Sequence, residues 1–242
     1  MHTQDAPPSP PSTERPAPWL LELYRTALGK KYVMAVTGIV LMGYVFAHML
    51  GNLKLYLGES DLNHYSEWLR DIATPIVPRT VALWLMRTGL IAAFVLHIHA
   101  AYSLTRMNRR ARGGWYESDR DYVAANFASR TMRWTGVIVG LFVLFHLMDL
   151  TWGNANPDFE RGEVYANVVA SFERVPVALT YVVANLALGV HLYHGSWSLF
   201  QSLGMNNPRF NHWRRWFAVG FAVLITVGNV SFPVAVLAGV VD

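Results

Sequence analysis

Five apolar stretches, each long enough to cross a lipid bilayer, constrain this chain more than any other feature. A hydrocarbon core of roughly 30 Å takes about 20 helical residues at 1.5 Å of rise each. The stretches run over residues 32–56, 79–105, 134–153, 175–202 and 214–240. Only 15% of the residues are charged, as expected of a chain that lies mostly in lipid. The sequence therefore predicts an all-α integral membrane protein, a bundle of five transmembrane helices.

The remaining segments predict a tail and two short helices. Residues 1–18 contain six prolines, which disfavour regular helix, so we expect a disordered tail followed by a membrane domain over 19–242. The amphipathic pattern of 19–28 fits either a short interfacial helix or an extension of the first span. Residues 58–78 predict an amphipathic helix between the first two spans. No internal repeat is evident.

Basic residues concentrate before the first span, between the second and third, and before the fifth, whereas the other loops mix basic and acidic residues. By the positive-inside rule, these three segments face the cytoplasm, with the N-terminus inside and the C-terminus outside. Confinement of the positive charge to segments that flank spans argues against binding of nucleic acid. The basic residues concerned are Arg25, Lys30, Lys31, Arg106, Arg109, Arg110, Arg112, Arg120, Arg130, Arg133, Arg209, Arg214 and Arg215.

Four of the five spans carry a histidine deep inside them, namely His48, His99, His146 and His194. Ionisable groups at this depth are costly and usually mark a functional site. In the predicted orientation, His48 and His146 lie in the outer half of the membrane, and His99 and His194 in the inner half. Two imidazoles from facing helices suit axial ligation of a haem iron. The chain has no cysteine, so an iron–sulphur centre would need histidine ligands or cysteines from a partner.

Two further histidines, His97 and His191, compete for the inner site. His97 lies about 200° around the helix from His99, so both cannot point at one haem; the greater inward depth of His99 favours it. His191 and His194 lie about 60° apart on one helix face, so geometry does not separate them. His191 could instead bond a haem propionate or line a quinone pocket. The extra imidazoles also leave open a histidine-ligated iron–sulphur centre shared with a partner.

Several motifs resemble the cytochrome b membrane-anchor subunit of succinate dehydrogenases and fumarate reductases, the kind made of one five-helix chain. The resemblance covers nearly the whole chain from Gly29 onward. It rests on Gly29-Lys30-Lys31, Ala35-Val36-Thr37-Gly38, His48-Met49-Leu50-Gly51-Asn52-Leu53, His99-Ala100-Ala101-Tyr102, Phe145-His146-Leu147, His191-Leu192-Tyr193-His194-Gly195-Ser196-Trp197 and Gln201-Ser202-Leu203-Gly204.

This resemblance implies two haems b, a distal one on His48 and His146 and a proximal one on His99 and His194. The His-x-x-Tyr and His-Gly-Ser motifs are the reason for choosing His99 and His194 in the second pair. It further implies a bacterial cytoplasmic membrane, a flavoprotein subunit that oxidises succinate, and an iron–sulphur subunit on the cytoplasmic side. Electrons would pass through this chain to quinone. The chain itself has no dinucleotide fingerprint and no P-loop, so the succinate chemistry is expected on the partners.

A quinone site needs a hydrogen-bonding group for each carbonyl and an apolar trough for the tail. Candidates at the inner face are Lys31, Arg106, His212 and Trp213, together with His97 and His191; those at the outer face are Glu67, Asp149 and Trp152. The sequence does not choose between the faces.

Two polar residues of the spans, Arg87 and Asp149, could pair with each other or extend to the interface. Two other functions remain open. One is an independent transmembrane cytochrome b, and the other is a redox-inactive anchor or transporter whose histidines pack or shuttle protons.

Overall fold

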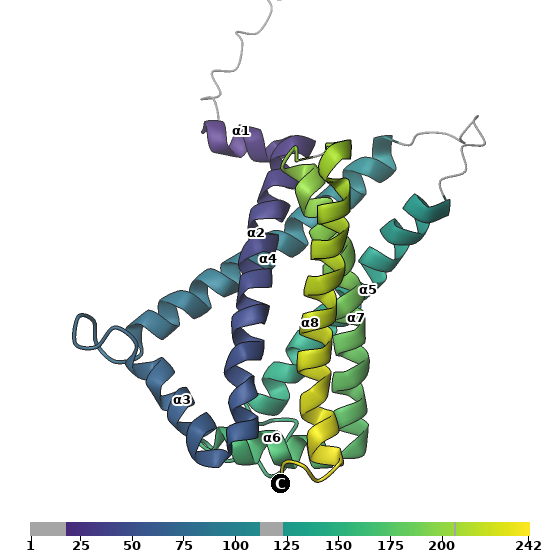
Figure 1. Cartoon of the computed structure of the whole chain (residues 1–242). Helices are drawn as coiled ribbons and strands as arrows, with labels where there is room; N and C mark the ends of the chain where they lie inside the picture. Colours follow the sequence, from purple (N-terminus) through teal and green to yellow (C-terminus); the bar gives the residue numbers. More distant parts are fainter. Residues whose placement is uncertain (1–17, 112–122, 206) are drawn as a thin grey trace, which may run out of the picture.

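A computed structural model describes residues 18–111, 123–205 and 207–242. The predicted tail therefore lies outside the described residues except for Pro18. The five long helices are α2 (Ala27–Asn52), α4 (Val81–Ala111), α5 (Val123–Leu150), α7 (Val175–Ser202) and α8 (Asn211–Leu237). They form one bundle (Figure 1), with the short helix α1 (Trp19–Arg25) at one end and α6 (Val164–Glu173) beside the C-terminus at the other. We call these the α1 end and the α6 end.

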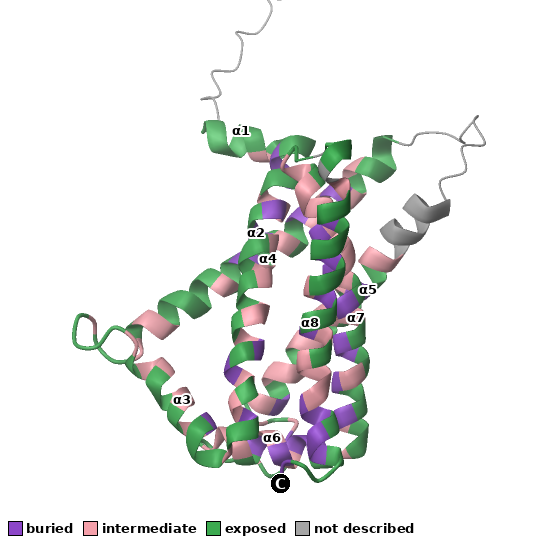
Figure 2. Ribbon diagram, viewed as in Figure 1, coloured by how far each residue is buried: buried purple, intermediate pink, exposed green. Residues whose placement is uncertain are grey.

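The five predicted spans are confirmed. Five segments are long and apolar enough to cross a membrane: Ala27–Leu57, Val81–Ala111, Thr131–Leu150, Val175–Ser202 and Asn211–Leu237. Large apolar side chains cover much of the outer surface of the helices, which is exposed along most of its length (Figure 2). Such an apolar exterior is unfavourable in water and suits contact with lipid. The protein is an all-α, multi-pass membrane protein.

Residues 19–25 form a separate helix, α1, whereas Ala27 and Leu28 already belong to α2. Thr26 has an extended backbone that ends α1, and its hydroxyl oxygen accepts a hydrogen bond of 2.9 Å from the Gly29 N–H as the N-cap of α2. The ammonium of Lys30 donates to the carbonyls of Tyr24 and Arg25, at 2.8 and 3.0 Å. A side chain at Gly29 would place its Cβ 1.9 Å from the carbonyl oxygen of Leu23. Glycine therefore permits the tight corner between α1 and α2.

The variant Gly29→Ala should loosen α1 from the bundle. Overpacking costs about 1–3 kcal/mol, which corresponds to roughly a 5- to 150-fold larger population of the opened corner. Limited digestion with trypsin measures this as faster cleavage after Arg25. The matched control is Gly43→Ala, because a Cβ there meets no atom within 4 Å. Equal cleavage rates in the two variants would contradict the account of this corner.

At the α6 end, the helix expected within 58–78 is α3 (Glu59–Asp71). The helix α6 was not predicted. It is held by packing, because its buried residues Val169 and Phe172 join a core cluster with Tyr181 of α7 and Phe232 of α8. Packing of this kind stabilises helices that are too short to persist alone.

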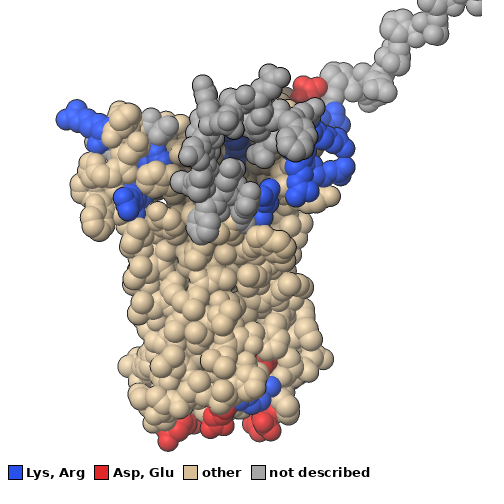
Figure 3. All heavy atoms as spheres, turned by 90° about the vertical axis from the view of Figure 1, so that its right-hand side faces the viewer, with Lys and Arg blue, Asp and Glu red and all other residues tan. Residues whose placement is uncertain are grey.

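An ion-pair cluster lies where α3 leads into α4, to one side of the bundle (Figure 1). Glu67 contacts both Arg70 and Arg79, and Asp71 accepts a hydrogen bond of 2.8 Å from Arg79. That hydrogen bond is the main cause that raises the pKa of Arg79 above its usual value. Figure 3 shows Lys and Arg gathered near the α1 end and Asp and Glu near the α6 end. This distribution is the one that the positive-inside rule associates with a cytoplasmic α1 end.

Candidate functional site

The structure brings His48 of α2 and His146 of α5 together near the α6 end. Their ring centroids lie 5.8 Å apart, with the ring planes tilted by 55°. Nδ1 of His48 lies 2.7 Å from the side-chain amide nitrogen of Asn52, one turn further along α2. Tyr44 and Phe142, one turn before each histidine, contact the imidazole rings. We call His48 and His146 the α6-end pair.

Toward the α1 end, His97 and His99 lie on different faces of α4. His99 is exposed, and its Nδ1 lies 2.5 Å from the hydroxyl of Tyr24 in α1. His97 lies on the face of α4 that meets α2, is half-buried, and has its Nδ1 3.2 Å from Oγ1 of Thr37.

The geometry likewise distinguishes His191 from His194 on α7. His191 is half-buried, and its Nδ1 lies 3.3 Å from Oγ1 of Thr135 on α5. His194 instead uses its Nε2, which lies 3.1 Å from Oγ1 of Thr131. We call His97 and His191 the α1-end pair.

The threonines fix which ring nitrogen of this pair is free. Thr37 donates its single hydroxyl proton to the carbonyl of Val33 at 2.7 Å, and Thr135 donates its own to the carbonyl of Thr131 at 2.7 Å. Each hydroxyl oxygen can then only accept from the Nδ1–H of its histidine. The lone pair of Nε2 is left available for a metal, which is the usual arrangement of a metal-bound histidine and its supporting hydrogen bond.

These contacts reveal an internal repeat that the sequence analysis missed. Thr37-Gly38 precedes His48 in α2 at the same spacing as Thr135-Gly136 precedes His146 in α5. In each repeat the threonine contacts a histidine of the next long helix, and the adjacent glycine lies beside that imidazole: a Cβ on Gly38 would be 3.6 Å from His97, and one on Gly136 would be 3.4 Å from His191. Alignment of residues 37–48 with 135–146 would have found both threonines.

One comparison with protein families gives a match. Residues 122–230, which are 109 of the 242 residues, match the model of the succinate dehydrogenase/fumarate reductase transmembrane subunit. The match spans α5 through most of α8 and includes His146 and His191. Comparisons with curated proteins and with solved structures give no significant match.

The two histidine pairs have the kind of nitrogen donors that axial ligation of haem requires. Within the described residues, no group of three or more His, Cys, Asp or Glu side chains is placed to hold a metal ion. A haem iron needs only two axial ligands from protein, because the macrocycle supplies the others. Open space also lies between the two levels of histidines, where a Cβ on Gly140 of α5 would meet no atom within 4 Å.

The inner-face quinone candidates lie at the α1 end but come from three different helices. Lys31, Arg106, His212 and Trp213 are all exposed. Arg106 lies over the ring of Tyr102, and the rings of His212 and Trp213 are 5.6 Å apart. Between α2, α7 and α8 runs an apolar groove of about 250 Å³, lined by Ile39, Met42, Gly43, Phe46, Leu199, Phe217 and Phe221.

The outer-face candidates are engaged elsewhere. Glu67 belongs to the ion-pair cluster between α3 and α4. Asp149 is fully buried and bonds Arg174 at 2.7 Å, so its pairing with Arg87, one of the alternatives left open by the sequence, is not observed. Arg87 lies instead over the ring of Trp84, 5.3 Å from its centroid. Trp152 is 56% exposed and does not line the apolar groove.

Proposed function

We propose that this chain is the membrane anchor and electron-transfer subunit of a bacterial succinate:quinone oxidoreductase. The observation that carries the proposal is the arrangement of two histidine pairs at two levels, each pair drawn from two helices, in a bundle with a family match. A flavoprotein subunit and an iron–sulphur subunit would bind on the cytoplasmic side, where the basic residues of the α1 end offer a complementary surface for an acidic partner.

Each histidine pair supplies the two axial ligands of one haem b in this proposal. His48 and His146 hold the haem of the α6 end, and His97 and His191 hold that of the α1 end. When bound, haem supplies one-electron chemistry. Thr37 and Thr135 hold the imidazoles of the α1-end pair with Nε2 free, and the apolar helices exclude water from both centres. If the α1 end is cytoplasmic, His97 and His191 form the centre nearer to the iron–sulphur subunit.

Quinone would bind at the α1 end. The apolar groove between α2, α7 and α8 suits an isoprenoid tail, and Trp213 lies one helical turn before Phe217, which lines that groove. The indole N–H of Trp213 and the imidazole of His212 are then donors for the quinone carbonyls. Lys31 and Arg106 are the remaining polar candidates at this end.

Purification of the chain from its native membrane tests the proposal. We expect two larger soluble subunits to copurify, and succinate to reduce the bound haems. An independent cytochrome b would purify without these subunits, and dithionite but not succinate would reduce its haems. A redox-inactive anchor or transporter would show no redox centre with either reductant.

Removal of the two threonine hydroxyls should weaken only the α1-end centre. Loss of the hydrogen bond that orients a metal-bound histidine typically costs about 10- to 100-fold in affinity. In the double variant Thr37→Val/Thr135→Val, haem transfer to excess apomyoglobin should therefore release one haem much faster than in the wild type. Thr88→Val is the control, because the hydroxyl of Thr88 is exposed and bonds only to the Trp84 carbonyl of its own helix. Equal retention of both haems in the double variant would show that the threonines do not support the ligands.

A further inference from the structure

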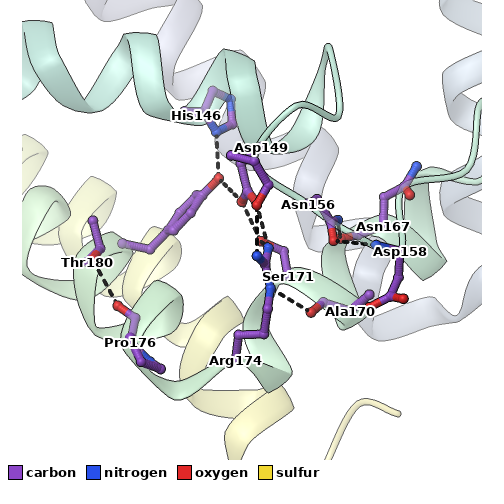
Figure 4. A network of polar contacts seen from close by, with 12 residues as sticks. His146, Asp149, Asn156, Asp158, Asn167, Ala170, Ser171, Arg174, Pro176 and Thr180 are labelled. Atoms are coloured by element: carbon purple, nitrogen blue, oxygen red, sulfur yellow. Dashed lines mark hydrogen bonds and ion pairs between the residues drawn. The ribbon is translucent and has the colours of Figure 1, made fainter.

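A fully buried carboxylate lies one helical turn beyond His146. Asp149 has no exposed surface, although it ends the apolar span of α5. A buried charge of this kind is costly unless several partners satisfy it. Its Oδ1 accepts a hydrogen bond of 2.7 Å from Arg174, and its Oδ2 accepts from the hydroxyls of Ser171 and of Tyr181, the latter at 2.8 Å. These donors come from α6, α7 and the junction between them (Figure 4).

The same tyrosine also reaches the histidine. The hydroxyl oxygen of Tyr181 lies 3.3 Å from Nδ1 of His146, and Figure 4 shows His146 and Asp149 close together on the same helix. A phenol has a single proton. Because Tyr181 donates it to the carboxylate of Asp149, its oxygen can only accept from the Nδ1–H of His146. The lone pair of His146 Nε2 is therefore free to face a metal.

We propose that Tyr181 and Asp149 are positioning residues of the α6-end haem, acting on the iron through His146. The proposal rests on the proposed function insofar as His146 is a haem ligand. Tyr181 fixes the tautomer and orientation of the imidazole. Asp149 holds the phenol proton, which makes the phenol oxygen a stronger acceptor for Nδ1–H and the imidazole a more basic ligand. A more basic axial ligand favours the oxidised iron and lowers its reduction potential.

The two pairs thus differ in the groups that support their imidazoles. The imidazoles of the α1-end pair bond to neutral threonine hydroxyls whose own protons go to backbone carbonyls. His146 bonds to a phenol held by a carboxylate, and Arg174 anchors that carboxylate to the α6 end through a further hydrogen bond of 2.8 Å to the carbonyl of Ala155. Because of this difference, we expect the reduction potential of the α6-end haem, and not that of the other haem, to depend on the hydrogen bonds around Asp149.

The variant Tyr181→Phe in the purified holo-complex tests this assignment. The phenyl ring keeps the packing of Tyr181 against Phe142, Phe145 and Phe172, so we expect both haems to remain. Redox titration should show a raised midpoint potential for the α6-end haem and an unchanged one for the other, each assigned by comparison with a variant that lacks His146 or His97. Thr180→Val is the matched control, because its exposed hydroxyl bonds only to the carbonyl of Pro176.

Asp149→Asn gives a second measurement, in which we also expect a raised midpoint potential of the α6-end haem. If this variant fails to assemble because the buried network is disrupted, the proposal is tested by Tyr181→Phe alone. An unchanged potential of the α6-end haem in Tyr181→Phe, or equal shifts of both haems, would overturn the proposal. Absence of haem from the wild-type complex would instead refute the proposed function, and this is seen before any variant is made.

Discussion

Replacement of His97 by alanine should remove the haem of the α1 end, whereas the same replacement of His99, two residues away, should leave both haems in place. The difference follows from the faces that these residues occupy on α4. His97 meets Thr37 of α2, while His99 is exposed and contacts Tyr24 of α1. Loss of His97 would leave the haem iron with one of its two axial ligands from the protein.

Haem quantification by the pyridine haemochrome method, relative to protein, measures this result. We expect about one haem per chain in His97→Ala and about two in His99→Ala, by the two-ligand rule for each haem. The pair His191→Ala and His194→Ala should behave in the same way, with loss of haem only in the first. Loss of a haem in His99→Ala and its retention in His97→Ala would show that the motif-based choice was correct and the present one is not.

Replacement of His48 by alanine should remove the haem of the α6 end and spare the other. His48 and His146 come from α2 and α5 and lie together with ring centroids 5.8 Å apart, so either substitution leaves a single imidazole at this level. The remaining haem should still be reduced by succinate, because His97 and His191 form the centre nearer to the proposed docking surface. A redox titration of His48→Ala should show one component in place of two.

Tyr44→Phe is a suitable control for this experiment, because the variant keeps an aromatic ring beside His48. Two outcomes of His48→Ala would contradict the pairing: retention of both haems, or loss of both from a chain that still folds and inserts.

The five spans could be predicted because a transmembrane helix is recognised from its own length and apolar composition, almost without reference to the helices that pack against it. The depths of the histidines followed from the same information, since rise per residue converts position into height along each helix. The presence of His48 and His146 at one level was therefore foreseeable, and the structure does bring these two residues together.

The choice between His97 and His99 depended on tertiary packing. It requires knowledge of which helix each face of α4 meets, and α1 turns across the bundle at Thr26 and places Tyr24 beside His99. No periodicity in α4 contains that information. The signal that the sequence did carry was the repeat of Thr37-Gly38 and Thr135-Gly136 before His48 and His146, which points to the threonines that meet His97 and His191.

The partner of Asp149 could not be predicted for a related reason. Arg87 seemed suitable because it lies in a span predicted at a similar depth, but Arg174 at the junction of α6 and α7 reaches the carboxylate instead. That junction exists because α6 packs Phe172 against Tyr181 of α7, and α6 is too short to be recognised from local propensity. Its contribution becomes visible only with the core cluster of the α6 end.

The measurement that tests the central claim most directly is a dithionite-reduced minus oxidised absorption spectrum of the purified complex, with haem and iron quantified on the same sample. The account predicts b-type spectra and about two haems per chain, one for each pair of axial histidines. Iron without haem would indicate that the histidines are ligands of a non-haem centre. The absence of both iron and haem would contradict an electron-transfer role for this chain.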